Sequence, residues 1–306
     1  MRTSLIIPAY NEEQAIKKVV DEALDYADEI IVVDDGSIDN TAKIVRQNFS
    51  KNAKVKLIRH AINQGKADAL RTGVSNATGE IVVFIDADDT YPCRHIPELA
   101  KKIEKREADV VIGSRFMPNP PANMSFSHRM GNKLFSGLVS YISSTDITDS
   151  QSGMRAFKRE IFPEIDVKAK SLEYEPKATA RAAKLGYKIK EIPIGYRERI
   201  GKSKINGTKD GIKILFSLIS VAYSETTLLA RMIMIPGIVI GFIGLLIGIG
   251  LIKDYLILGI VKRPYYPLIT VLSLLVSIQL FSLGLIIDNI TKKLSRMEEA
   301  IKKKGK

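Results

Sequence analysis

Two long apolar stretches near the C-terminus limit most strongly how this chain can fold. No charged residue lies between Met232 and Ile252, and none lies between Pro264 and Ile287. At about 1.5 Å per helical residue, the first stretch covers roughly 32 Å, which is about the thickness of the hydrocarbon core of a bilayer. The sequence therefore predicts two transmembrane helices, at about 232–252 and 264–287. Two buried core helices of a soluble protein are the alternative.

Basic residues follow the second apolar stretch and contribute to a formal net charge of +12. Beside an apolar span, such a cluster indicates attraction to anionic lipid headgroups rather than binding to nucleic acid. Two crossings return the tail to the side of the N-terminal part. Because lysine and arginine prefer the cytoplasmic side, we expect that part to be cytoplasmic and the protein to be a multi-pass membrane protein. The cluster comprises Lys292, Lys293, Arg296, Lys302, Lys303, Lys304 and Lys306.

Before the spans, short runs rich in β-branched residues alternate with runs whose apolar residues follow helical spacing. This alternation predicts an α/β domain over residues 1–207, with a mostly parallel sheet and helices on both faces. The predicted strands are Ser4–Pro8, Glu29–Asp34, Val55–Ile58, Glu80–Asp86 and Asp109–Gly113, and the predicted helices include Glu12–Tyr26, Asn40–Phe49, Lys66–Asn76 and Ile96–Lys105.

Residues 208–230 separate this domain from the two-helix anchor, which we expect to occupy residues 231–306. Between Ile212 and Ser224 the segment is apolar except for polar residues at helical spacing. This pattern predicts an amphipathic helix in the headgroup plane of the membrane. Packing against the soluble domain is an equal alternative.

An acidic pair follows the apolar residues of the fourth predicted strand. Asp86 and Asp88 are two residues apart, so both carboxylates point to the same face of an extended segment while Ala87 points away. Mg²⁺ or Mn²⁺ binds one or two carboxylates and completes its coordination with phosphate oxygens and water. Ligands of such sheets bind beyond the carboxyl ends of the strands. The pair therefore predicts a metal site for a diphosphate, with solvated loop acids as the alternative.

A second acidic pair, Asp34 and Asp35, ends the second predicted strand. One acid is enough to cap the following helix, so the other is available to accept hydrogen bonds from a base or a ribose. Tyr10 and Glu12, at the end of the first predicted strand, are candidates to line the same pocket. Glu12 has an alternative role in favouring its own helix N-terminus.

The motifs PAYNE, VVDDGS, NQGKADAL, FIDADD, VIGSRF, DSQSGMRAF and RIGKSK occur in this order between Ser4 and Lys204. Together they resemble glycosyltransferase family 2, especially its dolichyl- or polyprenyl-phosphate sugar synthase branch. The resemblance implies a GT-A fold, an inverting transfer and a nucleotide-sugar donor bound with Mg²⁺ or Mn²⁺. It departs from the family at Ala67, at Thr90 and in a loop shortened by one residue between Arg199 and Gly201.

The resemblance also assigns roles to particular positions, all of which are expectations. The expected donor site extends to Lys66 in NQGKADAL, and Asp86 and Asp88 are the expected metal ligands. The resemblance assigns five residues to the nucleotide: Pro8, Tyr10, Glu12, Val33 and Asp35. It assigns Asp86, Ala87 and Asp88 together to the metal and the diphosphate, and it assigns Arg115, Arg199 and Lys204 to phosphates.

A lipid monophosphate is already an anionic nucleophile, so its transfer site needs positive charge rather than a general base. The candidate acceptor-phosphate residues are Arg115, Arg129 and Arg155, with Ser152 and Gly153 as a turn that approaches the phosphate. An ordinary ion pair at the surface is the alternative for each arginine, and for Arg155 in particular. Asp88, Arg115 and Arg129 are the expected catalytic residues.

Two alternatives remain open. A transferase acting on a sugar hydroxyl requires a base, and Glu173 and Glu175 lie where other family members carry an acidic pair used in that way. A non-catalytic membrane scaffold that binds nucleotide is the more remote alternative.

Overall fold

The computed structural model describes residues 1–118, 124, 126–143, 145–167, 174–201, 227–260 and 263–304. The chain divides into two compact units, Met1–Val221 and Ala222–Lys306. Most of the predicted membrane-surface helix, residues 208–226, lies outside the described residues, and so do Glu173 and Lys204.

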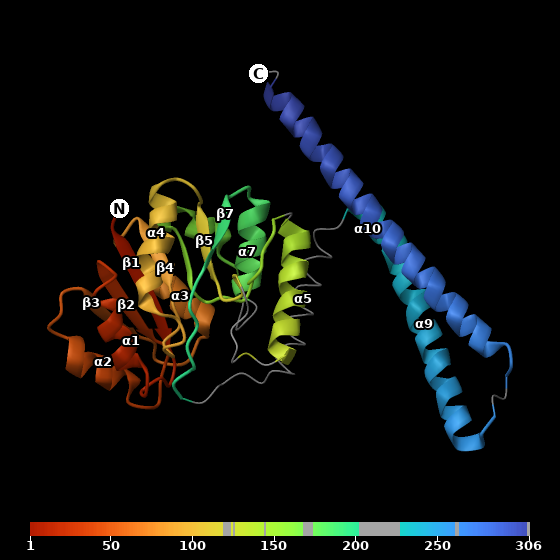
Figure 1. The fold of residues 1–306 in the computed structure, drawn as a ribbon, viewed down its shortest axis with the longest axis horizontal. Helices are drawn as coiled ribbons and strands as arrows, with labels where there is room; N and C mark the ends of the chain where they lie inside the picture. The colour runs from red at the N-terminus through yellow and green to blue at the C-terminus, as the bar shows by residue number, and fades with distance from the viewer. Residues whose placement is uncertain are drawn as a thin grey trace. The chain divides into compact units, whose positions relative to one another are not determined.

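Within the described part of the chain, a seven-stranded sheet forms the centre of the first unit (Figure 1). Its strands lie in the order β3-β2-β1-β4-β6-β5-β7, and β6 runs antiparallel to both of its neighbours. The first five strands agree with the predicted ones to within one or two residues, whereas β6 and β7 are additions. The strands are β1 (Thr3–Ala9), β2 (Glu29–Asp34), β3 (Val55–Arg59), β4 (Ile81–Phe84), β5 (Val110–Ser114), β6 (Arg155–Lys158) and β7 (Ile189–Pro193).

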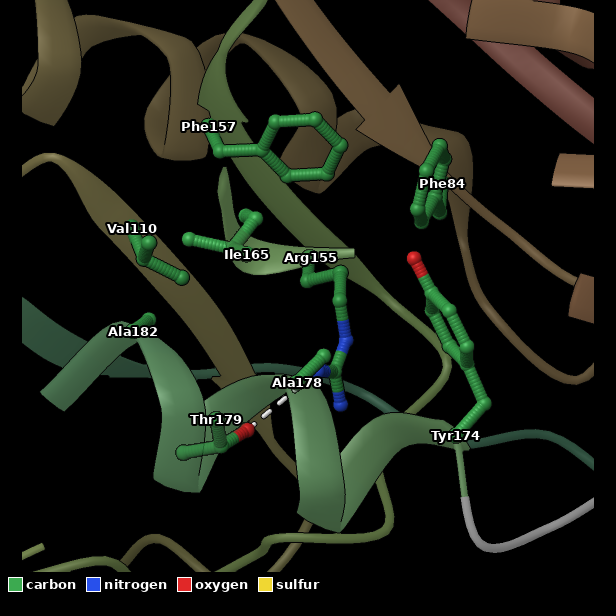
Figure 2. A pocket seen from close by; sticks show the side chains of 9 residues that line it. All are labelled: Phe84, Val110, Arg155, Phe157, Ile165, Tyr174, Ala178, Thr179 and Ala182. Carbon is green, nitrogen blue, oxygen red and sulfur yellow. Dashed lines mark hydrogen bonds between the residues drawn. The ribbon is translucent and has the colours of Figure 1, made fainter. Parts of the chain in front are cut away.

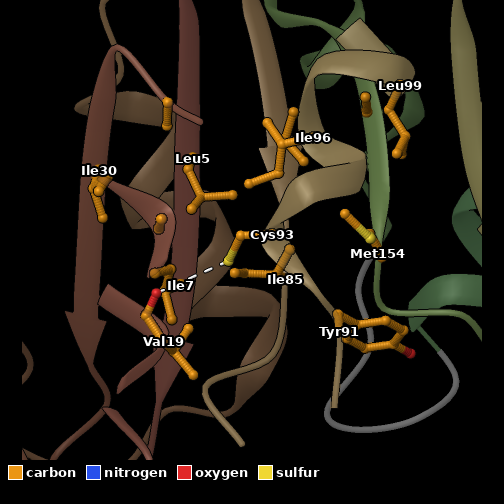
Figure 3. Packing of buried hydrophobic residues seen from close by; sticks show 14 of the residues in the cluster. Leu5, Ile7, Val19, Ile30, Ile85, Tyr91, Cys93, Ile96, Leu99 and Met154 are labelled. Carbon is orange, nitrogen blue, oxygen red and sulfur yellow. Dashed lines mark hydrogen bonds between the residues drawn. The ribbon is translucent and has the colours of Figure 1, made fainter. Parts of the chain in front are cut away.

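Helices cover both faces of this sheet, because alternate strand residues are apolar on both sides. In β1, Leu5 and Ile7 pack into one buried cluster and Ile6 packs into the other. Figure 3 shows part of the first cluster. That cluster includes residues of α1 (Ile16–Ala23), α2 (Thr41–Phe49) and α4 (Ile96–Glu104), and the second includes residues of α3 (Lys66–Ser75), α5 (Phe126–Ser143), α6 (Phe162–Ile165) and α7 (Tyr174–Lys184).

The second unit is a hairpin of two long helices, α9 (Leu228–Leu258) and α10 (Tyr266–Lys304). Both are candidate membrane spans, over Leu228–Leu258 and Tyr266–Thr291. Only 11% and 6% of their most apolar windows are buried, whereas a core helix of a soluble protein is mostly buried. The helices are longer than the predicted spans of 232–252 and 264–287.

Small residues let the two helices of the hairpin approach each other closely. A Cβ added to Gly244 would lie only 2.7 Å from the Cβ of Ser273, so the position requires glycine. Asp288 of α10 is fully buried and accepts a hydrogen bond from the N–H of Thr227, at the start of α9 (2.8 Å). This contact satisfies a carboxylate that would otherwise be costly in an apolar helix pair.

Candidate active site

The loops that follow β1 and β2 are joined at the carboxyl edge of the sheet. The N–H of Asn11 donates to Oγ of Ser37 (2.9 Å), and the N–H of Glu12 donates to Oγ1 of Thr41 (2.8 Å). Asn11 has a φ of 51°, a conformation that asparagine tolerates better than most residues. This loop replaces the first turn of the predicted helix, so α1 begins at Ile16 rather than at Glu12.

Asp35, which is expected to contact the nucleotide, is 3% exposed and holds the loop before α3. Its Oδ1 accepts from the N–H of Gln64 (2.9 Å) and lies 2.7 Å from Nδ1 of His60. Its Oδ2 accepts from the N–H of Gly65 (2.8 Å). Asp34 is fully buried. Asp35 therefore fixes the backbone of the loop that leads into α3. Its contact with a nucleotide stays a prediction.

Lys66, the first residue of α3, connects three parts of the site. Its Nζ lies 2.6 Å from Oδ1 of Asp86 and 2.6 Å from Oε1 of Glu175. Burial lowers the pKa of Lys66, but the negative charges of Asp86 and Glu175 outweigh burial and hold this pKa well above its ordinary value. A protonated lysine thus joins α3, the loop after β4 and the first turn of α7.

Arg199 lies beside Asp88, as Lys66 lies beside Asp86. Its Nη1 lies 3.0 Å from Oδ2 of Asp88, and its Nη2 donates to Oε1 of Glu12 (2.6 Å). Its Nε is buried and has no hydrogen-bond partner within the described ranges. Burial, and then the charge of Asp86, raise the pKa of the Asp88 carboxyl. The hydroxyl of Thr90 donates to Asp88 (2.6 Å) and is therefore occupied within the loop.

The acidic pair fits a divalent cation that has further ligands from outside the protein. No group of three or more histidine, cysteine or acidic side chains is placed to hold a metal ion in the part of the chain that the structure describes. A Cβ added to Gly153 would lie 2.5 Å from Oδ2 of Asp86, so the absence of a side chain there leaves room for this carboxylate. Two carboxylates completed by phosphate oxygens are a usual arrangement for Mg²⁺ and Mn²⁺.

Two tyrosines, Tyr91 and Tyr196, lie between the loop that follows β4 and the predicted acceptor residues Gly153 and Arg115. The N–H of Gly153 donates to Oη of the buried Tyr91 (2.9 Å). The ring of Tyr91 packs edge-on against Tyr196, with 5.8 Å between the ring centroids. The guanidinium carbon of Arg115 lies 5.3 Å from the centroid of the Tyr196 ring. The loop that follows β4, the turn at Gly153 and Arg115 are thus neighbours.

The two arginines expected to be catalytic have different surroundings. Arg115 forms a bidentate pair with the fully buried Asp149: Nε donates to Oδ2 (2.7 Å) and Nη2 donates to Oδ1 (2.9 Å). The N–H of Asp149 donates in turn to Oε1 of Glu191 (3.0 Å). Arg129 lies on α5, where its Nε donates to the carbonyl of Met124 (3.0 Å). The phosphate contacts of both arginines stay predictions.

Arg155, an expected acceptor-phosphate residue, lies inside the domain. This side chain is 3% exposed, and Figure 2 shows its guanidinium inside the domain beside Tyr174. Its Nη2 donates to the carbonyl of Ser152 (2.6 Å), and its Nη1 donates to the carbonyl of Glu175 (3.1 Å) and to Oγ1 of Thr179 (3.3 Å). In the structure Arg155 joins the turn at Gly153 to α7, and the side chain of Ser152 is fully buried as well. Contact of either residue with an acceptor phosphate stays a prediction.

The remaining expected donor residues lie around β1 and β2. Pro8 and Val33 are partners in the register of these two strands. Val33 is fully buried in the second core cluster, so any nucleotide contact at this position excludes its side chain. Tyr10 is half-buried directly after β1. Ala87 is 3% exposed and packs into the first core cluster, as expected from its alternation with the two acids.

Sequence reasoning did not single out Asp149, Tyr91 or Tyr196, although each of them positions a predicted residue. Asp149 lies within the motif DSQSGMRAF, but a lone acid in a polar turn carries no periodic signal that it will be buried against an arginine. The two tyrosines have no pattern at all that distinguishes them from core or surface residues.

Comparison with known proteins identifies the family of this chain. The glycosyl transferase family 2 model matches residues 4–166. The chain is 32% identical to the dolichyl-phosphate hexose transferase of Haloferax volcanii, covering 72% of this chain and 94% of that protein. It is 35% identical to the UDP-N-acetylglucosamine–dolichyl-phosphate N-acetylglucosaminyltransferase of Methanococcus voltae, covering 62% and 83%. It spans only 35% of the length of glycosyltransferase AglD from H. volcanii, at 26% identity.

A solved structure of similar fold is glucosyl-3-phosphoglycerate synthase from Mycobacterium tuberculosis, with a TM-score of 0.58, 21% identity, and coverage of 72% of this chain and 79% of that one. The mixed sheet with helices on both faces is thus a GT-A-like fold. The matched family model and the relatives then fix the assignment: the chain belongs to glycosyl transferase family 2. The names of these relatives confirm the resemblance to the dolichyl-phosphate branch.

Proposed function

We propose that this enzyme transfers a single sugar from a nucleotide-sugar, bound with Mg²⁺ or Mn²⁺, to the phosphate of a dolichyl or polyprenyl lipid. A phosphate oxygen of the lipid attacks the anomeric carbon on the face opposite the nucleotide. The new carbon–oxygen bond forms as the bond to the nucleoside diphosphate breaks, so the configuration inverts. The donor is a UDP-hexose, a UDP-N-acetylhexosamine or GDP-mannose.

The site around Asp86 and Asp88 supports the donor part of this proposal. A divalent cation held by the two carboxylates would neutralise negative charge on the departing diphosphate. Lys66 and Arg199 already lie beside these carboxylates and can turn toward phosphate oxygens. Nε of Arg199 is buried without a hydrogen-bond partner among the residues that the structure describes, which is consistent with a ligand oxygen at this place. The M. tuberculosis enzyme of similar fold was solved with Mn²⁺ and UDP.

The observation that carries the acceptor part is the ion pair between Lys66 and Glu175. Oε1 of Glu175 lies 2.6 Å from Nζ of Lys66, and the glutamate is 3% exposed. Nζ of Lys66 therefore occupies Oε1 of this buried carboxylate, whereas a general base has to present its oxygen to the acceptor hydroxyl. A lipid phosphate needs no such base. Relatives named for transfer to dolichyl phosphate point to the same acceptor.

The two candidate spans give the enzyme access to this acceptor, because a long-chain lipid phosphate does not leave the bilayer. We infer that the hairpin is a membrane anchor and that the catalytic domain is cytoplasmic, on the same side as the basic tail. The direct test uses the purified full chain with polyprenyl phosphate, Mn²⁺ or Mg²⁺, and a panel of UDP- and GDP-sugars. Sugar should appear on the lipid phosphate with one donor class, and its absence with every donor would contradict the proposal.

Replacing Glu175 with glutamine separates the two acceptor classes. With a phosphate acceptor, we expect transfer to fall by less than about tenfold, since loss of a general base costs about 10²- to 10⁴-fold and no base is required. Lys66 keeps Asp86 as a partner in this variant. The measurement is the rate of transfer to polyprenyl phosphate at saturating donor. A loss of about 10²-fold or more, with donor binding retained, would indicate a hydroxyl acceptor instead.

Replacing Gly153 with alanine tests the metal site without changing any charge. The added Cβ would lie 2.5 Å from Oδ2 of Asp86 and force this carboxylate to move. Overpacking costs about 1–3 kcal/mol, so we expect Mn²⁺ affinity in the presence of UDP to fall about 5- to 150-fold. Electron paramagnetic resonance of Mn²⁺ measures it directly. Gly131→Ala is the matched control, because its added Cβ meets nothing closer than 4.0 Å. Equal affinities in the two variants would place the metal elsewhere.

A further inference from the structure

The two faces of α5 differ in a way that the proposed reaction does not explain. Toward the sheet, Phe135 and Val139 are buried in the second core cluster. Polar side chains beside them hold the segment that contains Asp149: Nδ2 of Asn132 donates to the carbonyl of Thr148 (3.0 Å), and Oγ of Ser136 accepts from the N–H of Ser150 (2.9 Å). The inner face of α5 is therefore fixed to the segment whose Asp149 pairs with Arg115.

The opposite face of α5 is apolar and exposed. Met130 is 51% exposed, Leu134 is 55% exposed and Tyr141 is 38% exposed. Together with Gly137, whose added Cβ would meet nothing within 4 Å, these residues recur at spacings of three and four and share one side of the helix. We call Met130, Leu134, Gly137 and Tyr141 the outer face of α5. Exposed apolar side chains at helical spacing are typical of a surface that is covered by something else.

The charges on α5 indicate what covers this face. The helix sequence FSHRMGNKLFSGLVSYIS contains no acidic residue, and the exposed Lys133 borders the outer face. Apolar residues flanked by cations without acids are typical of helices that lie in the headgroup region of a membrane that contains anionic lipids. The same chain carries two helices that are candidate membrane spans.

We propose that the outer face of α5 is a membrane-contact surface of the catalytic domain, additional to the two spans. Leu134 and Met130 enter the boundary between headgroups and acyl chains, and Lys133 meets anionic headgroups. On the proposed function, this contact would keep the segment that holds Arg115 close to the lipid phosphate. The membrane contact itself does not depend on which reaction is catalysed.

The experiment places an environment-sensitive fluorophore on Leu134→Cys in the full chain, reconstituted in nanodiscs of phosphatidylcholine and phosphatidylserine. The natural Cys93 is buried, and burial raises the pKa of its thiol to about 12, so the parent chain should take up little label and serves as the labelling control. Leu185→Cys is the matched position. Leu185 is 44% exposed and precedes β7, at the edge of the sheet opposite the site.

We expect lipids that carry a spin label in the headgroup region to remove most of the fluorescence at position 134 and little of it at position 185. Aqueous iodide should show the reverse order. Iodide quenching at position 134 equal to that at 185 would mean that the outer face lies in water, and would overturn the proposal. Protection of position 134 from both quenchers would mean that protein covers it, which would also overturn the proposal. Because no readout involves sugar transfer, this result is independent of the transfer assay.

Discussion

Replacing Asp88 with asparagine is expected to reduce sugar transfer by about three orders of magnitude. Neutralising the charge on a leaving diphosphate is worth several kcal/mol, and each 1.4 kcal/mol corresponds to about a tenfold change in rate. Asparagine keeps the size of the side chain and an oxygen for the hydroxyl of Thr90, which donates to Asp88 (2.6 Å). It removes the negative charge that a cation needs. Transfer rates and Mn²⁺ binding in the presence of UDP should fall together.

The adjacent Asp89 offers a matched control for this variant. Asp89 has a φ of 65°, which asparagine adopts readily, so Asp89→Asn removes the same charge one residue away with little backbone strain. Its partners are Lys18 (2.6 Å) and Arg197 (3.1 Å), which lie outside the acidic pair. We expect this variant to retain Mn²⁺ binding and most of its transfer rate. If Asp88→Asn behaved like Asp89→Asn, the acidic pair would not be the metal site.

Replacing Asp149 with alanine should destabilise the catalytic domain by about 3–5 kcal/mol, because it leaves the charge of Arg115 buried and without its partner. Asp149 is fully buried and accepts three hydrogen bonds from Arg115, two from the guanidinium and one from the backbone N–H. Thermal unfolding of the full chain in detergent measures the loss. A change smaller than about 1 kcal/mol would show that the pair is exposed to solvent and contributes little to stability.

The double variant Arg115→Met with Asp149→Leu distinguishes the structural role of Arg115 from its expected role in the reaction. Replacing both members of a buried ion pair with apolar residues is often neutral for stability. We therefore expect the unfolding temperature to recover toward that of the parent chain while transfer to lipid phosphate stays low. Recovery of transfer together with stability would mean that Arg115 serves the fold alone and contacts no phosphate.

Much of the fold could be predicted because the signals for its strands and helices lie in residues close together in the sequence. The strand from Glu29 to Asp34 contains four consecutive β-branched residues, and its bounds in the structure are the predicted ones. By contrast, β6 was missed, although it lies between β4 and β5 in the middle of the sheet. It is four residues long and contains the charged residue Arg155. A pattern of apolar residues therefore does not indicate a buried strand at this place.

In the candidate site, too, local features could be predicted from the sequence and long-range contacts could not. The spacing of Asp86 and Asp88 predicts two carboxylates on one side of a strand end, because side chains alternate along extended backbone. The partners of these carboxylates carry no such local signal. Glu12 and Arg199, which meet beside Asp88, are 187 residues apart in the chain. The burial of Arg155 also carries no local signal, since the sequence shows an arginine near a turn but not how deeply it is buried.

The amino-acid sequence by itself determined the two candidate membrane spans, the alternation of strands and helices, and the acidic pair after β4, because hydrophobicity and side-chain alternation act over a few neighbouring residues. Only the tertiary structure decided which cations lie beside those acids, that Glu175 is held by Lys66, and that Arg115 is paired with Asp149. These contacts form when the sheet closes and brings distant segments together, and their free energies depend on burial, which no short stretch of sequence specifies.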